Sequence, residues 1–214
     1  MKIINKISDR NRENKYNIFI NLFSPNANTK ILDVGASELE YRQTSNYLEK
    51  KYPYPGNITV LGIDDYNEFC IRYPQVTVVK YDGEVFPFED NKFDMCWCNA
   101  VIEHVGDRRK QEIFLNEIIR VSKCAFISTP NKHFIYEPHT KVLFLHFLPK
   151  NIFNSIVKLI GKPWAGGDYM HLLGERDIVN LLNKCNIDKY RIIKNKLLCF
   201  TIDFVIIINE PGLV

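Results

Sequence analysis

The amino-acid sequence predicts a doubly wound α/β fold, in which helices cover both faces of a mostly parallel sheet. Three observations predict it. Short apolar runs alternate with segments of helical periodicity over the first 130 residues, and two further β-rich runs close the chain. The length of 214 residues suits one domain and leaves little room for a second. Strands that alternate with helices imply parallel βαβ units.

The N-terminal part of the chain covers residues 1–28. Within it, a leading helix is predicted over residues 8–23. Its apolar residues keep helical spacing up to Phe23, and Pro25 ends the segment. A short apolar strand over 30–34 then runs into Gly35, and residues 38–51 have a helical pattern. The beginning of the sheet is therefore a strand, a tight turn and a helix.

Four more apolar strands are predicted over residues 58–63, 76–80, 93–99 and 124–129, with a helix over 107–121. Along the fourth strand, Cys96 and Cys98 alternate with Trp97. Successive strand residues point to opposite faces of a sheet. We therefore expect both cysteines to pack against helices on one face, and Trp97 to lie on the other.

The character of the sequence changes after Pro130. Residues 131–172 are rich in aromatic residues, Leu, Pro and His, and we expect an insertion of short helices and loops that covers the functional edge of the sheet. In residues 173–214, helical periodicity returns over 174–186. Two β-rich runs at 190–198 and 201–209 then predict a closing hairpin.

Composition excludes several classes of protein. The aromatic share of 13% and hydrophobic share of 46% are those of a folded protein. A net charge of +3 with scattered basic residues does not indicate dedicated nucleic-acid binding. The six cysteines match neither zinc spacing nor a disulfide scaffold, which favours a reduced cytoplasmic setting. We expect no signal peptide and no transmembrane segment, while peripheral contact with a membrane stays open.

The strand ends carry the residues of chemical interest, because ligands bind a doubly wound sheet beyond the carboxyl ends of its strands. Gly35 would let the backbone come close to a ligand, and the helix start after it offers free N–H groups. Asp64 ends the second strand, where a carboxylate can accept hydrogen bonds from both ribose hydroxyls of a nucleoside. The neighbouring Asp65 lies one residue further into the loop and ranks below it.

The third and fourth strands end in further polar residues. Asp82, which precedes Gly83, can accept a hydrogen bond from the exocyclic amine of adenine, and Phe86 or Phe88 could pack on the ring. Asn99 ends the fourth strand, and a Glu-His pair follows it closely. Four successive strand ends therefore carry groups suited to an adenine nucleoside.

The order of these segments over residues 30–131 resembles the class I S-adenosylmethionine-dependent methyltransferases. The segments are Ile31-Leu32-Asp33-Val34-Gly35, Gly62-Ile63-Asp64, Tyr81-Asp82-Gly83 through Phe86-Pro87-Phe88, Phe93-Asp94 and Val101-Ile102-Glu103-His104-Val105. The resemblance implies a Rossmann-like sheet of seven strands whose last strand is antiparallel, which agrees with the predicted hairpin. It also makes residues 30–130 a cofactor-binding core.

The resemblance assigns the cofactor S-adenosylmethionine to particular residues. It implies that Asp33 and Gly35 lie at the methionine end of the cofactor, Asp64 at the ribose, Asp82 with Gly83 at the adenine, and Asn99 along the pocket. Ala36 and Ser37 stand where the family often has further glycines, which makes this loop bulkier.

The insertion supplies the candidates for catalysis. Its segment from Thr129 onwards is similar to a bacterial branch of these enzymes whose substrates are mostly unassigned. Glu137 and His139 are polar candidates near the transferred methyl group, or else His139 only holds a turn. His104 is a third candidate, although the Glu103–His104 pair is more simply interpreted as holding the corner after the fourth strand. The spacing of the histidines and cysteines predicts no metal site.

The methyl acceptor is open to three classes: a small molecule, a lipid or a glycan-type precursor. The apolar stretch over residues 142–160 could line a lipid-like pocket or contact a membrane surface, or simply form a second small core. Two other functions compete with methyl transfer. An NAD-dependent oxidoreductase is disfavoured because the first turn lacks the pattern Gly-x-Gly-x-x-Gly. A non-catalytic binding protein is favoured by the absence of glycine at Ala36 and Ser37.

Overall fold

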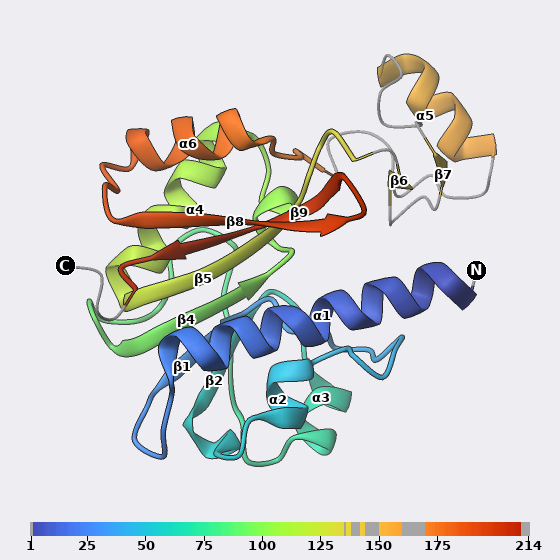
Figure 1. The fold of residues 1–214 in the computed structure, drawn as a ribbon. Coiled ribbons are helices and arrows are strands. Elements are labelled where there is room, and N and C mark those ends of the chain that lie inside the picture. Colours follow the sequence, from blue (N-terminus) through green and yellow to red (C-terminus); the bar gives the residue numbers. More distant parts are fainter. Residues whose placement is uncertain (1, 135, 138–141, 144–149, 160–169, 211–214) are drawn as a thin grey trace.

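A seven-stranded sheet organises the chain in the computed structural model, which describes residues 2–134, 136–137, 142–143, 150–159 and 170–210 (Figure 1). From one edge of the sheet to the other, the strands are β3 (Thr77–Lys80), β2 (Ile58–Gly62), β1 (Ile31–Val34), β4 (Phe93–Asn99), β5 (Ser122–Pro130), β9 (Phe200–Ile208) and β8 (Tyr190–Leu197).

The strand directions confirm the predicted fold class. The five strands from β3 to β5 are parallel, whereas β9 pairs antiparallel with both β5 and β8. The chain starts at β1 in the middle of the sheet, builds outward to β3, and then returns to β4 on the other side of β1. Strand order therefore reverses between β1 and β4, and this is where a doubly wound sheet binds its ligand.

One face of the sheet is covered by α4 (Arg108–Val121) and α6 (Glu175–Lys184), as Figure 1 shows. The side chains of Cys96 and Cys98 are buried there among Ile118 and Leu181. Asp107 begins α4 as its N-cap, because its carboxylate accepts a hydrogen bond from the Lys110 N–H at 3.0 Å. The prediction that both cysteines pack against helices is confirmed.

The opposite face is covered by α1 (Lys2–Phe23), α2 (Tyr47–Lys51) and α3 (Asn67–Arg72) (Figure 1). Trp97 stacks on Phe126 with ring centroids 4.8 Å apart, and Phe19 of α1 meets the Trp97 ring edge-on at 5.1 Å. This aromatic cluster fixes α1 across β4 and β5. The helix already begins at Lys2, so its N-terminal turns extend beyond the predicted residues 8–23.

The predicted helix over residues 38–51 is wrong over most of its length. Only Tyr47–Lys51 is helical, and the residues before it form turns and bends. The charged side chains of this stretch hold distant elements instead. Glu38, for example, accepts hydrogen bonds from the backbone N–H groups of Glu68 and Phe69 at the start of α3. The short helices α3, η1 (Pro55–Asn57) and η2 (Ile102–His104) were not predicted individually.

The insertion leaves and rejoins the fold at one point. Asn131 forms an isolated parallel bridge with Leu173, and the Lys132 N–H donates to the Leu173 carbonyl at 3.0 Å. Between these ends the structure describes β6 (Tyr136–Glu137) paired with β7 (Val142–Leu143), and α5 (Lys150–Leu159). His139 lies outside the described residues, as does the side chain of Glu137.

Candidate functional site

The turn after β1 has a shape that requires glycine. Gly35 has φ +84°, and a Cβ atom built on it would lie 2.4 Å from Cγ2 of Val101, closer than real Cβ contacts allow. The Gly35 N–H donates to the Leu61 carbonyl at 2.9 Å, which holds the turn against β2. The backbone therefore lies close to the segment that follows β4.

Side-chain hydrogen bonds hold the bulkier residues that follow. Asn46 brackets Ser37, because its Oδ1 accepts from the Ser37 N–H and its Nδ2 donates to the Ser37 carbonyl, both at 2.8 Å. The Tyr66 hydroxyl donates to the Ala36 carbonyl, also at 2.8 Å. Gly62 leaves room for the Tyr66 ring, since a Cβ there would lie 1.9 Å from the hydroxyl oxygen. The loop is thus ordered by polar partners where the resembled family often has glycines.

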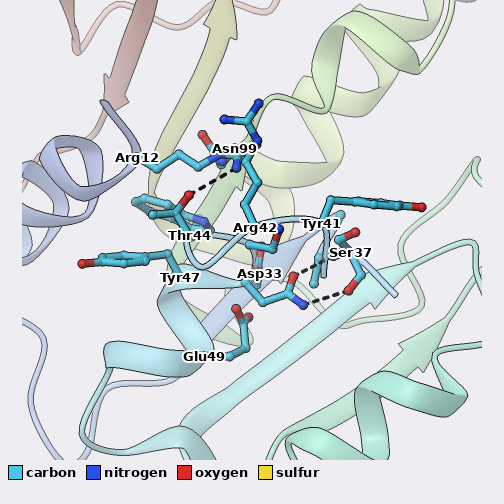
Figure 2. A pocket seen from close by; sticks show the side chains of 14 residues that line it. Arg12, Asp33, Ser37, Tyr41, Arg42, Thr44, Tyr47, Glu49 and Asn99 are labelled. Atoms are coloured by element: carbon cyan, nitrogen blue, oxygen red, sulfur yellow. Dashed lines mark hydrogen bonds between the residues drawn. The ribbon is translucent and has the colours of Figure 1, made fainter. Parts of the chain in front are cut away.

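A cavity of about 400 Å³ opens beneath this loop (Figure 2). It lies between the carboxyl ends of β1 and β4, the loop, α2 and the N-terminal half of α1. Its lining residues are Arg12, Asp33, Gly35, Ala36, Ser37, Tyr41, Arg42, Thr44, Ser45, Asn46, Tyr47, Glu49, Trp97 and Asn99.

The cavity contains acidic and basic groups. Asp33 and Glu49 are both buried, and burial raises the pKa of each carboxyl, that of Asp33 well above its usual range. Two arginines, Arg12 and Arg42, also line it. Burial and the neighbouring charge of Arg42 lower the pKa of Arg12, while the carboxylate of Asp9 raises it. Such a cavity suits a ligand end that carries both a positive and a negative charge.

Asp64 and Asp82 lie outside the cavity lining, at the same edge of the sheet. Gly62 of β2 is in register with Lys80 of β3, so each aspartate follows its strand by two positions. Both are exposed to solvent. Asp82 accepts a hydrogen bond from the Glu84 N–H at 3.0 Å, and Gly83 between them has φ +89°. Two carboxylates are therefore available to a ligand that extends from the cavity.

The aromatic rings that we expected on the adenine face are placed elsewhere. Phe86 and Phe88 are buried in the core, where Phe86 packs edge-on against Tyr81 and Phe114. Their apolar character is used for packing between α4 and the sheet. Neither ring is exposed beside Asp82, so the predicted stacking role is wrong.

Asn99 is oriented by a buried polar network. Its Oδ1 accepts from the Ser128 hydroxyl at 2.6 Å and from Lys15 Nζ at 3.3 Å. Lys15 is almost fully buried and also forms an ion pair with Asp203 at 2.9 Å. A lysine only donates hydrogen bonds, so its contact identifies the oxygen of the Asn99 amide. The amide nitrogen of Asn99 is left to interact with a ligand in the cavity.

The Glu103–His104 corner joins several elements. Buried Glu103 accepts a hydrogen bond from the Thr129 hydroxyl at 3.1 Å, and its backbone carbonyl accepts from the His171 N–H at 2.8 Å. Gln111 of α4 donates to the carbonyls of Ile102 and His171. These contacts favour a structural role for the corner, and His104 as a catalytic residue stays a prediction.

Four of the charged residues around the cavity were not predicted from the sequence. Lys15 could have been found, because it lies four residues before buried Phe19 on the apolar face of the leading helix. Arg12 is one turn further towards the N-terminus. Glu49 adjoins buried Leu48 in a segment predicted to be helical. No local pattern distinguishes Arg42.

Within the described ranges, no group of three or more His, Cys, Asp or Glu side chains could hold a metal ion. All six cysteines are free thiols. In the same part of the chain, no helix is long and apolar enough to cross a bilayer.

Comparisons with known proteins agree with the fold. Residues 32–124 match a family model described as a methyltransferase domain. A search of curated proteins found no match. Among solved structures, a SAM-dependent methyltransferase from Methanosarcina mazei is 19% identical with a TM-score of 0.55, and the match covers 89% of this chain and 95% of that one.

Two further solved structures show the range of proteins with this fold. The N-terminal domain of EvdMO1, with SAH (S-adenosylhomocysteine) bound, is 16% identical with a TM-score of 0.57, covering 93% of this chain and 80% of that one. The [4+2]-cyclase SpnF is 16% identical with a TM-score of 0.53, covering 86% and 57%. In sequence, residues 32–124 are therefore similar to a methyltransferase domain, and most of the chain shares the fold of these solved structures.

Proposed function

We propose that this chain, a class I methyltransferase in its fold, uses S-adenosylmethionine to methylate an acceptor. The observation that carries the proposal is the cavity between β1 and β4, where Asp33 and Glu49 accompany Arg12 and Arg42. The amino-acid end of the cofactor carries an ammonium and a carboxylate, so it matches both pairs of charges. Asp64 and Asp82, at the same sheet edge, are then available to the nucleoside end.

In this proposal each predicted cofactor residue has a defined task. Asp33 attracts the ammonium, while the backbone from Gly35 to Ser37 packs along the methionine part. Asp64 accepts hydrogen bonds from the ribose hydroxyls, and Asp82 accepts one from the adenine amine, with Gly83 beside it. Asn99 donates from its amide nitrogen, since Lys15 and Ser128 occupy its oxygen.

Methyl transfer itself requires little acid–base chemistry from the protein. The sulfonium of the cofactor is already activated, so the main requirement is an in-line approach of the acceptor atom within about 3–3.5 Å of the methyl carbon, with water kept out. For an oxygen acceptor, a carboxylate or imidazole would assist by taking the proton. Glu137, His139 and His104 are the candidates, in that order.

The acceptor is proposed to be a small molecule, a lipid or a glycan-type precursor that binds on the side of the insertion. Support comes from the position of the insertion, whose ends join the fold at Asn131 and Leu173, just beyond β5. The apolar residues of 142–160 would favour an acceptor with an apolar part.

Calorimetric titration with S-adenosylhomocysteine and, separately, with NAD tests the cofactor. Binding of the first alone is expected. Asp64→Ala should weaken that binding by about tenfold, because two hydrogen bonds to the ribose are lost. Asp65→Ala is the matched control, since Asp65 pairs with Lys80 at the surface and should leave affinity within about twofold. Unchanged affinity in Asp64→Ala would refute the assignment.

Transfer of the methyl group needs its own experiment, because a cyclase shares the fold. The protein is incubated with methyl-labelled cofactor and bacterial-type extract separated into glycan, lipid and small-molecule pools. Label in one pool identifies the acceptor class. Tight binding of S-adenosylhomocysteine with no label in any pool would instead favour a non-catalytic binding protein or another reaction.

A further inference from the structure

The floor of the cavity contains a carboxyl group that the predicted cofactor contacts do not use. Glu49 is only 5% exposed, and its carboxylate oxygens are buried. Among the described residues, only the Asp33 carboxyl and the backbone of Glu49 itself interact with these oxygens through hydrogen bonds. Figure 2 shows Glu49 reaching from α2 towards Asp33 at the end of β1. A buried carboxylate with so few donors is costly, so a ligand that supplies more of them would be bound strongly.

The pairing of these two carboxyls implies a shared proton. Two ionised carboxylates side by side in a buried site repel each other, whereas one proton between them makes a hydrogen bond. Burial and the neighbouring carboxyl both raise the pKa of Asp33, which agrees with this arrangement. Without the cofactor, the pair therefore carries one proton and a single negative charge.

We propose that Glu49, together with Asp33, recognises the ammonium group of the cofactor's amino-acid end, and that the pair releases one proton when the cofactor binds. This inference rests on the proposed function. The ammonium keeps its own three protons and donates from them to the two carboxylates. The proton that had joined the carboxyls passes to the solvent. The pair changes from one negative charge to two, and the ammonium compensates the second.

The arginines determine which way round the amino acid lies. Arg12 donates weakly to Thr44, with 3.4 Å between Nη1 and Oγ1, and Arg42 contacts Asn5 and Asp9 of α1. Both guanidinium groups retain donors that can bind a carboxylate. An amine alone would satisfy only the carboxyl pair, and a carboxylate alone only the arginines. The cavity therefore selects for a ligand group that carries both an amine and a carboxylate.

Other charged and titratable groups face the pair and must be considered in any pH experiment. From the loop and α2 these are Glu40, Tyr41, Arg42, Tyr47 and Lys50; from α1, Arg12; from α3 and its flanks, Tyr66 and Tyr73; from β4, Cys96 and Cys98. The pKa values of Tyr66, Tyr73, Cys96 and Cys98 are all raised, chiefly by burial. None of these four therefore ionises around neutral pH.

Calorimetry in two buffers of different ionisation enthalpy, phosphate and Tris, counts the protons released at pH 7. Wild-type protein is expected to release up to about one proton on binding S-adenosylhomocysteine. Glu49→Gln should release none and bind at least about tenfold more weakly, because a charge-assisted hydrogen bond is lost. Glu89→Gln, the same change at an exposed residue outside the cavity, should behave as the wild type.

A second probe separates this inference from the proposed function. 5′-Methylthioadenosine has the nucleoside and the sulfur but no amino-acid end, so it should bind both proteins equally and release no proton. If the wild-type protein bound neither S-adenosylhomocysteine nor 5′-methylthioadenosine, the proposed function would be refuted. Binding of S-adenosylhomocysteine with no proton released, or with equal affinity in Glu49→Gln, would overturn only the role of Glu49.

A pH series of the wild-type protein repeats the test without a substitution. The dissociation constant for S-adenosylhomocysteine should rise about tenfold for each pH unit below the pKa of the pair, while that for 5′-methylthioadenosine stays flat. Equal pH dependence of the two probes would overturn the inference even if Glu49→Gln did not fold.

Discussion

The two ends of the candidate cofactor site are built in opposite ways. At the β1 end, Asp33 and Glu49 are buried, and the loop above them is held by Tyr66 and Asn46. At the end formed by β2 and β3, Asp64 and Asp82 are exposed. Electrostatic interactions are much stronger away from water, so the enclosed end should dominate affinity and stability. The open end should recognise the nucleoside, and substitutions there should change the stability of the fold little.

Two of the glycines with positive φ, one at each end of the site, test this difference most strongly. Gly35→Ala should lower the free energy of unfolding by about 3 kcal/mol, because a strained backbone conformation adds to the overlap with Val101. Gly83→Ala has similar strain, but its Cβ would lie 3.7 Å from Ile63, and the loss should be about 1 kcal/mol. Urea denaturation measures both. Equal losses would show that the two ends are not packed differently.

The buried carboxyls predict an unusual dependence of stability on pH. Their pKa values are raised in the folded state, so their contribution is fully present below the unfolded-state pKa of about 4 and is lost as the pH rises through the folded-state values. The loss is about 1.4 kcal/mol for each unit by which a pKa is raised. Melting temperatures of the ligand-free protein should therefore fall as the pH is raised above the unfolded-state pKa of about 4, judged against Glu49→Gln.

In Glu49→Gln the melting temperature should be higher than in the wild type at pH 8, and its decline with pH should be smaller. Glu89→Gln should follow the wild type. If the melting temperature of the wild type rose with pH instead, the two carboxyls would not destabilise the fold when they ionise.

The hydrogen bond from Tyr66 to the cofactor loop should have a moderate effect. Tyr66→Phe leaves the Ala36 carbonyl without that donor and should cost about 1 kcal/mol of stability and about fivefold in affinity for S-adenosylhomocysteine. Tyr81→Phe, in the open half, removes a hydroxyl that forms no hydrogen bond with the described residues, and should change affinity by less than about twofold. Calorimetry on both variants makes the comparison.

Of these substitutions, the one at Asp82 in the open end is expected to have the smallest effect. Asp82→Asn should weaken binding of S-adenosylhomocysteine by about threefold to fivefold and alter stability by less than about 0.5 kcal/mol. The amide oxygen can still accept from the Glu84 N–H, so the turn survives. Glu84→Gln, also exposed, should leave affinity unchanged. A large loss of stability in Asp82→Asn would contradict the division between the ends.

The open end could be predicted from the sequence and the enclosed end largely could not. Asp64 and Asp82 follow apolar strands directly, so strand periodicity alone places them at the sheet edge. Arg12 and Lys15 reach the site only because Phe19 packs α1 against Trp97 and Phe126, a contact between distant segments. Such contacts have no local pattern.

The misassigned helix has the same cause. Residues 38–46 do not continue the helix, because Glu38 is held by α3, and Glu40 by Tyr73 and Lys50. Tertiary hydrogen bonds therefore override the local preference. The strands were predicted closely because continuous apolar runs such as β1 are buried on both faces, and few other structures accommodate them.

The bridge between Asn131 and Leu173 has an evolutionary consequence. Because the insertion enters and leaves the sheet at adjacent residues, its length can change without moving β5 or α6, and the entropic cost of a longer loop grows only slowly. Descendants of one ancestral chain could thus exchange this segment as a cassette and acquire new acceptors while their cofactor chemistry stayed fixed. An engineer could graft a foreign insertion at the same two positions.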